Sequence, residues 1–351
     1  MNSLLDSPIW QLTIASWKEF FREPIAIFWT YGFPFLLAIG LGLAFMNRPV
    51  EKIPIVVKND SSGKATTIAE ILKMDPRLEV IVTSEEDARN QLRIAKVAAV
   101  VVPVDSEIGY EYMLDPNRPE GVLARAAVDN AMLKKRTGQT VDVPVRELNE
   151  PGGRYIDFLV PGLIGTNMLG GGLFGVGFTI VDLRIRKLLK RFLATPMKKR
   201  DFFLSLLLSR ISFTVIEIGL FLLFAMLAFQ ITVRGSWVAL ALMITMGSAC
   251  FSGMGFLIAS RAKTMETAMG LVNLIMLPSY LFCGVFFSST NFPGWTQPII
   301  SRLPLTVLND GLRSIINDGG GVMDVVIPLI VLAIWTGASY LLGARLFRWL
   351  G

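Results

Sequence analysis

Six hydrophobic stretches, each long enough to cross a bilayer, surround one polar block in this sequence. The stretches cover residues 25–46, 156–181, 204–232, 237–260, 267–287 and 325–344, and the polar block covers residues 47–155. A hydrocarbon core of roughly 30 Å needs about 20 apolar residues of helix, and every stretch reaches that length. The sequence therefore predicts a membrane α-helical fold: six transmembrane helices, one plus five, with an inserted α/β extracytoplasmic domain.

Charge distinguishes the two sides of the predicted bundle. The formal net charge is +6, yet the block 47–155 carries nearly equal numbers of basic and acidic residues. The excess positive charge lies in the N-terminal segment, in residues 182–201 and 260–264, and in the C-terminal tail. Short basic connections stay in the cytoplasm, whereas a long domain crosses whatever its charge. Both termini are thus predicted inside and the polar block outside. The basic loops are expected to face anionic headgroups or a cytoplasmic partner rather than nucleic acid.

Residue usage excludes several kinds of chemistry. Charged residues make up only 18% of the chain and hydrophobic residues 52%, whereas soluble domains carry roughly 25% charged residues. Histidine is absent, and the two cysteines, Cys250 and Cys283, lie in predicted spans. A zinc site or a disulfide framework is therefore not expected. No grouping of nucleophile, base or metal ligands is visible, so the sequence predicts no catalytic residue and no metal site.

Residues 1–24 have the pattern of an amphipathic helix. Ser7 is suited to cap this helix and Pro8 to occupy its first position. The apolar side is predicted to carry Trp10, Ile14, Trp17 and Phe21, and the opposite side Gln11, Ala15, Lys18 and Arg22. Such a helix lies in the membrane interface, and Pro24 would end it. The alternative is a continuous extension of the first span, residues 25–46, which is interpreted as an uncleaved anchor.

Within residues 47–155, short β-branched runs alternate with helical segments. Strands are expected at residues 53–58, 78–83, 97–102, 108–114 and 140–145, with helices at 65–74, after Ser84 and at 120–136. No phosphate loop, paired carboxylates or nucleophile elbow is visible in this block. It is predicted to be a small α/β domain, and gating, recruitment of an accessory protein and cargo selection are all open as its role.

Two charged residues interrupt the third span. A charge at the centre of a transmembrane helix costs roughly 2.5–3.5 kcal/mol, which the apolar residues of this span offset. Arg210 lies near the cytoplasmic end, where its guanidinium can extend to the interface. Glu217 lies deeper on the same face and either lines a pathway or bonds a neighbouring helix. Asn167 and Asn273 are further intramembrane polar residues, expected more often to join helices than to bind a ligand.

The second span is rich in glycine. Gly171 and Gly175 form a G-x-x-x-G pattern, which lets two helix backbones approach closely. The pattern fits a dimer seam and packing within one subunit about equally well.

Residues 184–203 combine strong positive charge with one apolar stripe. The stripe consists of Leu188, Leu189, Phe192 and Leu193. Thr195 and Pro196 are predicted to end this helix and to start a short second one. A basic amphipathic helix held beside the membrane is suited to receive force from a cytoplasmic protein. The alternative is simple anchoring to lipid headgroups.

The run Phe192-Leu193-Ala194-Thr195-Pro196-Met197, followed by basic residues, resembles the Leu-Leu-x-Thr-Pro segment of type-2 permeases of ABC transporters. The whole architecture resembles the branch of that family with a large extracytoplasmic domain after the first span. Residues 100–105 are similar to the end of a strand in that domain. Residues 284–287 and 304–313 resemble the external re-entrant region, placed here at residues 288–324. The sequence departs from the family at Lys187 and Leu188, because Gly-Thr often stands there, and this bears on the contact with the ATPase.

The resemblance implies a permease subunit of a bacterial ABC exporter, with residues 184–203 as a coupling helix seated on a separate ATPase. The implied coupling residues are Arg191, Phe192, Leu193, Ala194, Thr195, Pro196, Met197 and Lys198. Since the chain has no G-x-x-x-x-G-K-[ST] motif, ATP and Mg are expected on the partner ATPase, and this chain is expected to bind no cofactor and to be no enzyme. A second permease, identical or paralogous, is expected. The transporter is placed in the bacterial inner membrane, in contact with the lipid bilayer, with an amphipathic, drug-like or lipid-like substrate.

Two other functions are kept as alternatives. An ion-coupled secondary transporter would use Glu217, but no inverted repeat is visible in the spans. A non-transport receptor or scaffold would use the external domain to bind a ligand.

Overall fold

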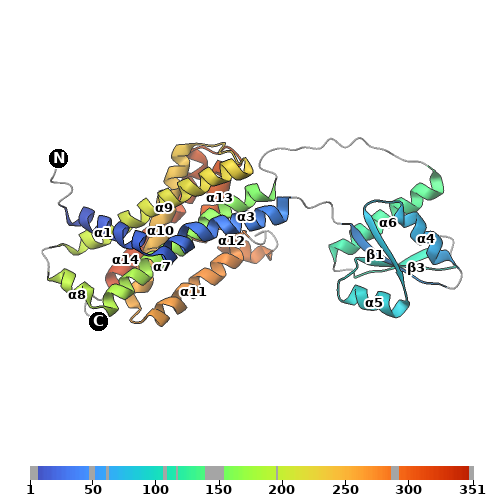
Figure 1. The fold of residues 1–351 in the computed structure, drawn as a ribbon, viewed down its shortest axis with the longest axis horizontal. Coiled ribbons are helices and arrows are strands. Elements are labelled where there is room, and N and C mark those ends of the chain that lie inside the picture. The colour runs from blue at the N-terminus through green and yellow to red at the C-terminus, as the bar shows by residue number, and fades with distance from the viewer. Residues whose placement is uncertain are drawn as a thin grey trace. The chain divides into compact units, whose positions relative to one another are not determined.

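The computed structural model describes residues 7–46, 52–60, 63–105, 109–115, 118–138, 154–194, 197–285 and 292–347. The chain divides into two compact units (Figure 1). The helical unit comprises Met1–Met46 and Asn149–Gly351, and the α/β unit comprises Asn47–Leu148. Each unit has its own hydrophobic core, and the two are described separately.

Among the described residues of the helical unit, five helices are long and apolar enough to cross a membrane. They are α7 (Tyr155–Ile185), α9 (Lys199–Phe229), α10 (Trp237–Arg261), α11 (Met265–Phe282) and α14 (Val326–Leu346). Each contains most or all of one of the five later hydrophobic stretches of the sequence. The predicted membrane α-helical fold is therefore confirmed.

The N-terminal part of the chain forms two consecutive helical segments. Helix α1 (Pro8–Arg22) begins at Ser7, whose side chain accepts a hydrogen bond from the Trp10 backbone. Glu23 leaves the helical conformation, with φ −106° and ψ 91°, because the following proline disfavours an α conformation before it. The chain then continues without a break through α2 (Pro24–Ile27), a π-helical turn (Phe28–Gly32) and α3 (Phe33–Met46). The break at Glu23 contradicts one continuous helix from α1 into the first apolar stretch.

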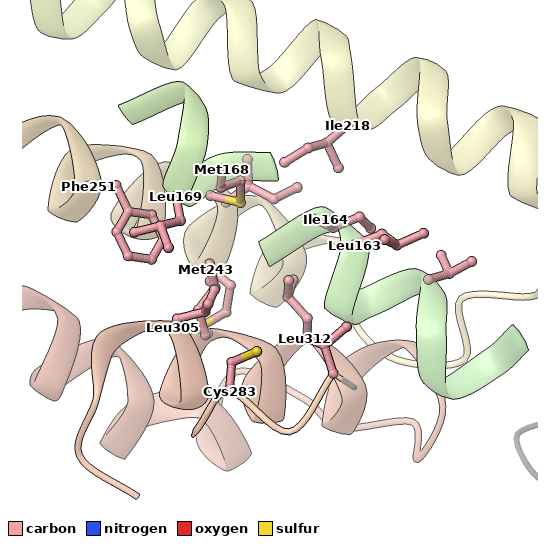
Figure 2. Close-up of a cluster of buried hydrophobic side chains, with 14 of the residues drawn as sticks. Leu163, Ile164, Met168, Leu169, Ile218, Met243, Phe251, Cys283, Leu305 and Leu312 are labelled. Atoms are coloured by element: carbon pink, nitrogen blue, oxygen red, sulfur yellow. The ribbon is translucent and has the colours of Figure 1, made fainter. Parts of the chain in front are cut away.

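Helix α7 forms the centre of the helical unit and packs against α9, α10, α11, α13 and α3. Apolar side chains from several of these helices meet in one core (Figure 2). Gly172 of α7 faces Gly255 of α10, where a Cβ atom would lie 2.5 Å from the Gly172 carbonyl oxygen. Small residues at this crossing thus allow the two backbones to touch, as in many transmembrane helix pairs.

Three shorter α-helices and two single 3-10 turns, Gly294–Thr296 and Met323–Val325, complete the described part of this unit. The three α-helices are α8 (Leu188–Leu193), α12 (Gln297–Ile300) and α13 (Pro304–Ile316). Helix α13 buries one face against α7, α10 and α14, which explains why its sequence is too apolar for a surface loop. Phe286 and Phe287, expected in the same external region, lie outside the described residues.

The α/β unit contains a four-stranded sheet with the order β2-β1-β3-β4. The strands are β1 (Ile53–Lys58), β2 (Leu78–Thr83), β3 (Ala99–Pro103) and β4 (Tyr110–Met113). Strand β1 pairs in parallel with β2 and β3, whereas β3 and β4 are antiparallel.

Helices cover both faces of this sheet. They are α4 (Lys64–Lys73), α5 (Glu85–Arg93) and α6 (Pro119–Thr137). Ile55 and Val57 pack with α4 and α6, whereas Val56 and Val100 pack on the other face with Ala88 of α5. Alternate residues of one strand thus fill two separate cores. The extended segment expected at residues 140–145 lies outside the described residues.

Candidate functional site

A buried polar cluster joins α7 to α9. Arg210 and Glu217 of α9 form an ion pair, with 3.5 Å between Nη2 and Oε2, and both side chains are at least nine-tenths buried. The Asn167 side-chain amide of α7 donates a hydrogen bond to Oε1 of Glu217. Three of the four polar residues expected inside the membrane are therefore in contact with one another.

The local sequence explains how this cluster forms. Arg210 and Glu217 are seven residues apart, close to two helical turns, so their side chains leave the same face of α9. The guanidinium lies over Gly171, where a Cβ atom would overlap it, and a Cβ at Gly175 would lie 3.7 Å from Arg210 Cδ. Arg210 does not extend to the interface as expected, since it is only 8% exposed and points toward Glu217.

The two glycines of the G-x-x-x-G pattern thus have a use inside one chain. Gly171 and Gly175 leave space on α7 for the Arg210 side chain. Of the two interpretations, packing within a subunit is the one that these contacts support. A dimer seam at Gly175, which is exposed, stays a prediction.

The hydrogen bonding of the cluster is incomplete. Within the described chain, Arg210 Nε and Nη2 and Glu217 Oε2 have no hydrogen-bond partner, and neither has the buried hydroxyl of Tyr31. Tyr31 lies within electrostatic range of both charged groups. Because an unpaired charge in a low-dielectric interior is costly, the cluster depends on its one ion pair. Apart from its position in an apolar stretch, nothing in the sequence indicated that Tyr31 belongs to this cluster.

A small pocket adjoins the cluster. It is lined by Pro34, Leu163, Ile164, Asn167, Glu217, Ile218 and Phe221. Its volume is about 10 Å³, no more than the roughly 10–15 Å³ that one water molecule needs. Glu217 therefore does not line an open passage in this conformation.

Asn273 lies apart from the cluster. It is on the exposed face of α11, together with Gly270 and Leu274. Helix α11 uses its opposite face, including Ala268 and Val272, to contact the rest of the unit. The position of Asn273 leaves its amide available to a molecule outside this chain.

Helix α8 has one buried and one basic face. Leu189 is 1% exposed, and the Phe192 ring packs on Phe202 at 5.6 Å between centroids. Lys190 and Arg191 are exposed, as are Ala194 and Lys198, whereas Met197 is half-buried. Thr195 and Pro196 lie outside the described residues, and the Leu193 side chain is not described. The described part of the segment is thus an amphipathic element with its basic side free of the core.

The start of this segment is attached to the ends of two other helices. The Arg184 guanidinium donates to the backbone carbonyls of Ala259 and Ala262 at the end of α10 and lies 5.2 Å from the Phe347 ring centre. Lys187 has a left-handed backbone, with φ 59°, a conformation that glycine adopts without strain. The chain therefore keeps the sharp turn between α7 and α8 although lysine replaces the glycine common in the resembling family. The sequence did not distinguish Arg184 from the other basic residues of this segment.

Helix α1 lies alongside α9 (Figure 1). Trp17 Nε1 donates a 3.0 Å hydrogen bond to Ser212 Oγ, and the Trp17 ring stacks on Phe213 at 4.6 Å. Phe20 also contacts Phe213, at 4.8 Å between ring centres. Helix α1 is thereby fixed to α9, the helix that carries the Arg210–Glu217 pair.

The other end of the bundle has its own polar contacts. Arg313 of α13 lies 3.9 Å from the Phe158 ring centre and donates to the Gly284 carbonyl. Asn317 donates to the Asp157 carbonyl at 3.0 Å, and the fully buried Asn309 donates to Cys283. These bonds hold α13 against α7 and against the segment after α11.

Comparison with known proteins identifies a matching family and two relatives. The family described as ABC-2 family transporter protein matches residues 24–345. ABC transporter G family member 20 of Dictyostelium discoideum is 23% identical over 189 residues, covering 53% of this chain and 26% of that protein. The linearmycin resistance permease protein LnrN of Bacillus subtilis is 23% identical over 176 residues, covering 50% of this chain and 46% of that protein.

The two relatives and the family match differ in how much they cover. The chain spans about a quarter and just under half of the lengths of the two relatives. The family match, in contrast, runs from α2 through almost all of α14 and includes the polar cluster, α8 and α13. Taken with the five candidate spans, this match shows that the chain is a multi-pass membrane protein and belongs to the ABC-2 family of transporter proteins.

Proposed function

We propose that this chain is the permease subunit of an ABC exporter and forms the translocation pathway for an amphipathic, drug-like or lipid-like substrate. The family match over residues 24–345 is the observation that carries the proposal. One relative is named as a linearmycin resistance permease, and export is one way in which a permease confers resistance. ATP and Mg would be used by a separate ATPase subunit, so that this chain is itself no enzyme and binds no cofactor.

Helix α8 is the proposed contact with the ATPase. Its exposed Lys190 and Arg191 are free of the core, while Leu189 on the other face packs against α7 and α9 residues. A displacement of α8 is therefore passed directly to the ends of both helices. The incompletely bonded Arg210–Glu217 pair lies between the same two helices, and we propose that α9 shifts against α7 there during transport.

The wider arrangement follows the same proposal. The first apolar segment, α2 to α3, would be the sixth span, giving both termini on the cytoplasmic side of a bacterial inner membrane. The polar block, residues 47–155, which contains the α/β unit, would be extracytoplasmic, and residues 288–324 would form the external re-entrant region. A second permease, identical or paralogous, would complete the pathway, and the exposed face of α11 with Asn273 is one surface it could contact.

Ion-coupled transport through Glu217 is not favoured by any observation. Glu217 is paired with Arg210 and faces a pocket of about 10 Å³. The small pocket beside Glu217 and a groove between α1 and α9 are both lined by residues of the helical unit, so neither of them supports a receptor site in the α/β unit.

The ATPase contact can be tested by reversing charge on α8. Lys190→Glu with Arg191→Glu is expected to prevent co-purification of an ATPase, because two cations on the exposed face become anions. A matched variant, Lys134→Glu with Lys135→Glu, reverses the same charge on the exposed end of α6 and should leave co-purification intact. Equal ATPase recovery from both variants would contradict the proposal. So would labelling from outside the cell at a cysteine placed at position 190.

A further inference from the structure

A groove of about 680 Å³ runs between α1 and α9. Its lining residues are Trp10, Thr13, Ile14, Trp17, Phe21, Leu208, Ile211 and Ser212, together with Lys18 and Arg22. The volume is within the range of roughly 300–1,000 Å³ that is usual for ligand pockets. The groove is a concave and mainly apolar surface, unlike the convex face of a helix that simply meets lipid.

The polar groups at the base of the groove are already bonded. Thr13 is 5% exposed and donates to the Ile9 carbonyl at 2.8 Å. Ser212 accepts from Trp17 and donates to the Ser209 carbonyl at 2.8 Å. An occupant of the interior therefore gains nothing from polar atoms there, and the interior is suited to hydrocarbon.

Positive charge gathers at the rim. Lys18 and Arg22 were expected on the side of α1 opposite the aromatic residues, but they line the groove instead. They are four residues apart and flank the apolar stripe, so their long side chains reach its border. Neither forms an ion pair with any residue that the structure describes, and Glu19 and Glu23 do not line the groove.

We infer that the groove is a binding site for an anionic phospholipid of the surrounding bilayer, with an acyl chain between α1 and α9 and the phosphate at Lys18 and Arg22. Apolar walls with a cationic rim match the two parts of such a lipid. Tryptophan at headgroup depth and basic residues near an anionic surface are the usual attachments of an interfacial helix. The inference needs only a chain that lies in a membrane, and it does not depend on the proposed ATPase contact.

The bound lipid would fill the space between α1 and one edge of α9. Trp17 and Phe20 hold α1 on α9 beside the groove, and Arg210 lies on the same stretch of α9, next to the groove residues Leu208 and Ile211. Filling the groove with an acyl chain extends the α1–α9 contact by apolar surface that would otherwise be a gap. The composition of the lipid is thereby linked to the position of the helix that carries the polar cluster.

Tryptophan quenching by brominated lipids tests this site in the full chain. Trp10 and Trp17 are kept as reporters, and the other five of the seven tryptophans are replaced by Phe. The protein is placed in vesicles that mix phosphatidylcholine with brominated phosphatidylglycerol, or with brominated phosphatidylcholine for comparison. We expect phosphatidylglycerol to be preferred at least about fivefold, the factor that corresponds to the roughly 1 kcal/mol of one basic residue near an anionic surface.

Removing the charges of Lys18 and Arg22 tests whether these two residues cause the preference for phosphatidylglycerol. Lys18→Gln with Arg22→Gln should reduce the ratio to about one. The matched variant Arg261→Gln with Lys263→Gln removes two exposed charges outside the groove and should keep the ratio of the parent protein. If the first variant does not fold, salt gives a second measurement, because at 1 M the Debye length is about 3 Å and the preference of the parent protein should fall.

Three results would overturn the inference. Equal quenching of the parent protein by the two brominated lipids would remove the charge recognition. An equal loss of preference in the matched variant would assign it to the general surface charge. Loss of all lipid quenching in a crosslinked pair of chains would show that a second copy, rather than a lipid, occupies the groove.

Discussion

Helix α7 has two interfaces built from neighbouring glycines that are used in opposite ways. Toward α10, Gly172 allows backbone contact, and a Cβ at Gly255 would meet three main-chain atoms. Toward α9, Gly171 instead makes space for a charged side chain, the guanidinium of Arg210. One interface is closed by backbone contact, whereas the other includes a buried ion pair and an amide among its apolar contacts.

The difference has a mechanical consequence. Main-chain atoms in close contact have no alternative position, so the α7–α10 pair should move as one body. The α7–α9 interface contains a long, flexible side chain and polar atoms without hydrogen-bond partners. Such a contact can exchange partners at moderate cost, which is what a moving interface requires. We expect α7 and α10 to form the fixed part of the bundle and α9 the mobile part.

The largest predicted effect is at the ion pair. Glu217→Leu leaves Arg210 buried without a counter-charge and should destabilise the helical unit by about 3–5 kcal/mol. The double variant Arg210→Leu with Glu217→Leu removes both charges and should recover most of that loss, because apolar residues can replace a buried pair. The unfolding midpoint in mixed detergent micelles measures both. A double variant less stable than the single one would show that the charges are bonded to other groups.

The next effect concerns the fixed interface. Gly255→Ala places a Cβ 2.5 Å from the Gly172 carbonyl oxygen and 3.1 Å from the Gly177 nitrogen. Since its three nearest neighbours are all main-chain atoms, the helices must separate, at an expected cost of about 1–3 kcal/mol. Gly270→Ala on α11 is the control, because no atom lies within 4 Å of its Cβ position. Similar midpoints for the two variants would mean that α7 and α10 are not held by this contact.

Gly171→Ala should cost less stability than Gly255→Ala, although its Cβ would overlap Arg210 directly. The overlapping atoms are the far end of a flexible side chain, which can move away. Its displacement weakens the pair with Glu217, so transport should fall more than stability does. Gly170→Ala, next in the sequence and with no atom within 4 Å, should change neither. A larger stability loss at 171 than at 255 would reverse the assignment of fixed and mobile interfaces.

The sequence predicts the elements of this molecule better than their contacts. The length of each apolar run gives the five later helices, and β-branched runs give the strands of the small sheet, because both depend on local composition. Spacing along α9 also places Arg210 and Glu217 on one face. The bond between Glu217 and Asn167, 50 residues away, depends on the rotation of α7 about its axis, which no local pattern specifies.

The adjacent glycines show the same limit. Gly171 and Gly172 are equivalent in a G-rich run, yet they face different helices and serve different purposes. Similarly, Lys18 and Arg22 follow the polar side of a helical wheel, but the length of their side chains brings them to the groove. Packing between distant segments, rather than local preference, decides these positions.

The smallest expected effect is at a partly exposed ion pair in the α/β unit, which contrasts with the buried pair of α9. Arg77 donates to Asp75 at 2.7 Å, and the two side chains are 53% and 13% exposed, respectively. The hydrogen bonds from Arg77 lower the pKa of Asp75 below its ordinary value of 3.8. Its stabilising contribution is therefore complete above that ordinary value and is lost only as the pH falls through the lowered one. Solvent screening limits the contribution to less than about 1 kcal/mol.

Asp75→Asn should therefore shift the unfolding of the α/β unit only slightly at pH 7, and lowering the pH from 7 to 5 should not change the difference between the variant and the parent protein. Hydrogen exchange of the β1 and β2 amides in the full chain measures this unit separately from the helices. The matched control is Arg89→Gln, which removes the ion pair between Arg89 and Glu85 on the exposed side of α5. A loss at position 75 as large as that of Glu217→Leu would mean that exposure does not distinguish the two pairs. In that case the dependence of the α7–α9 interface on its buried charge would have to be explained by geometry instead of by the surrounding dielectric.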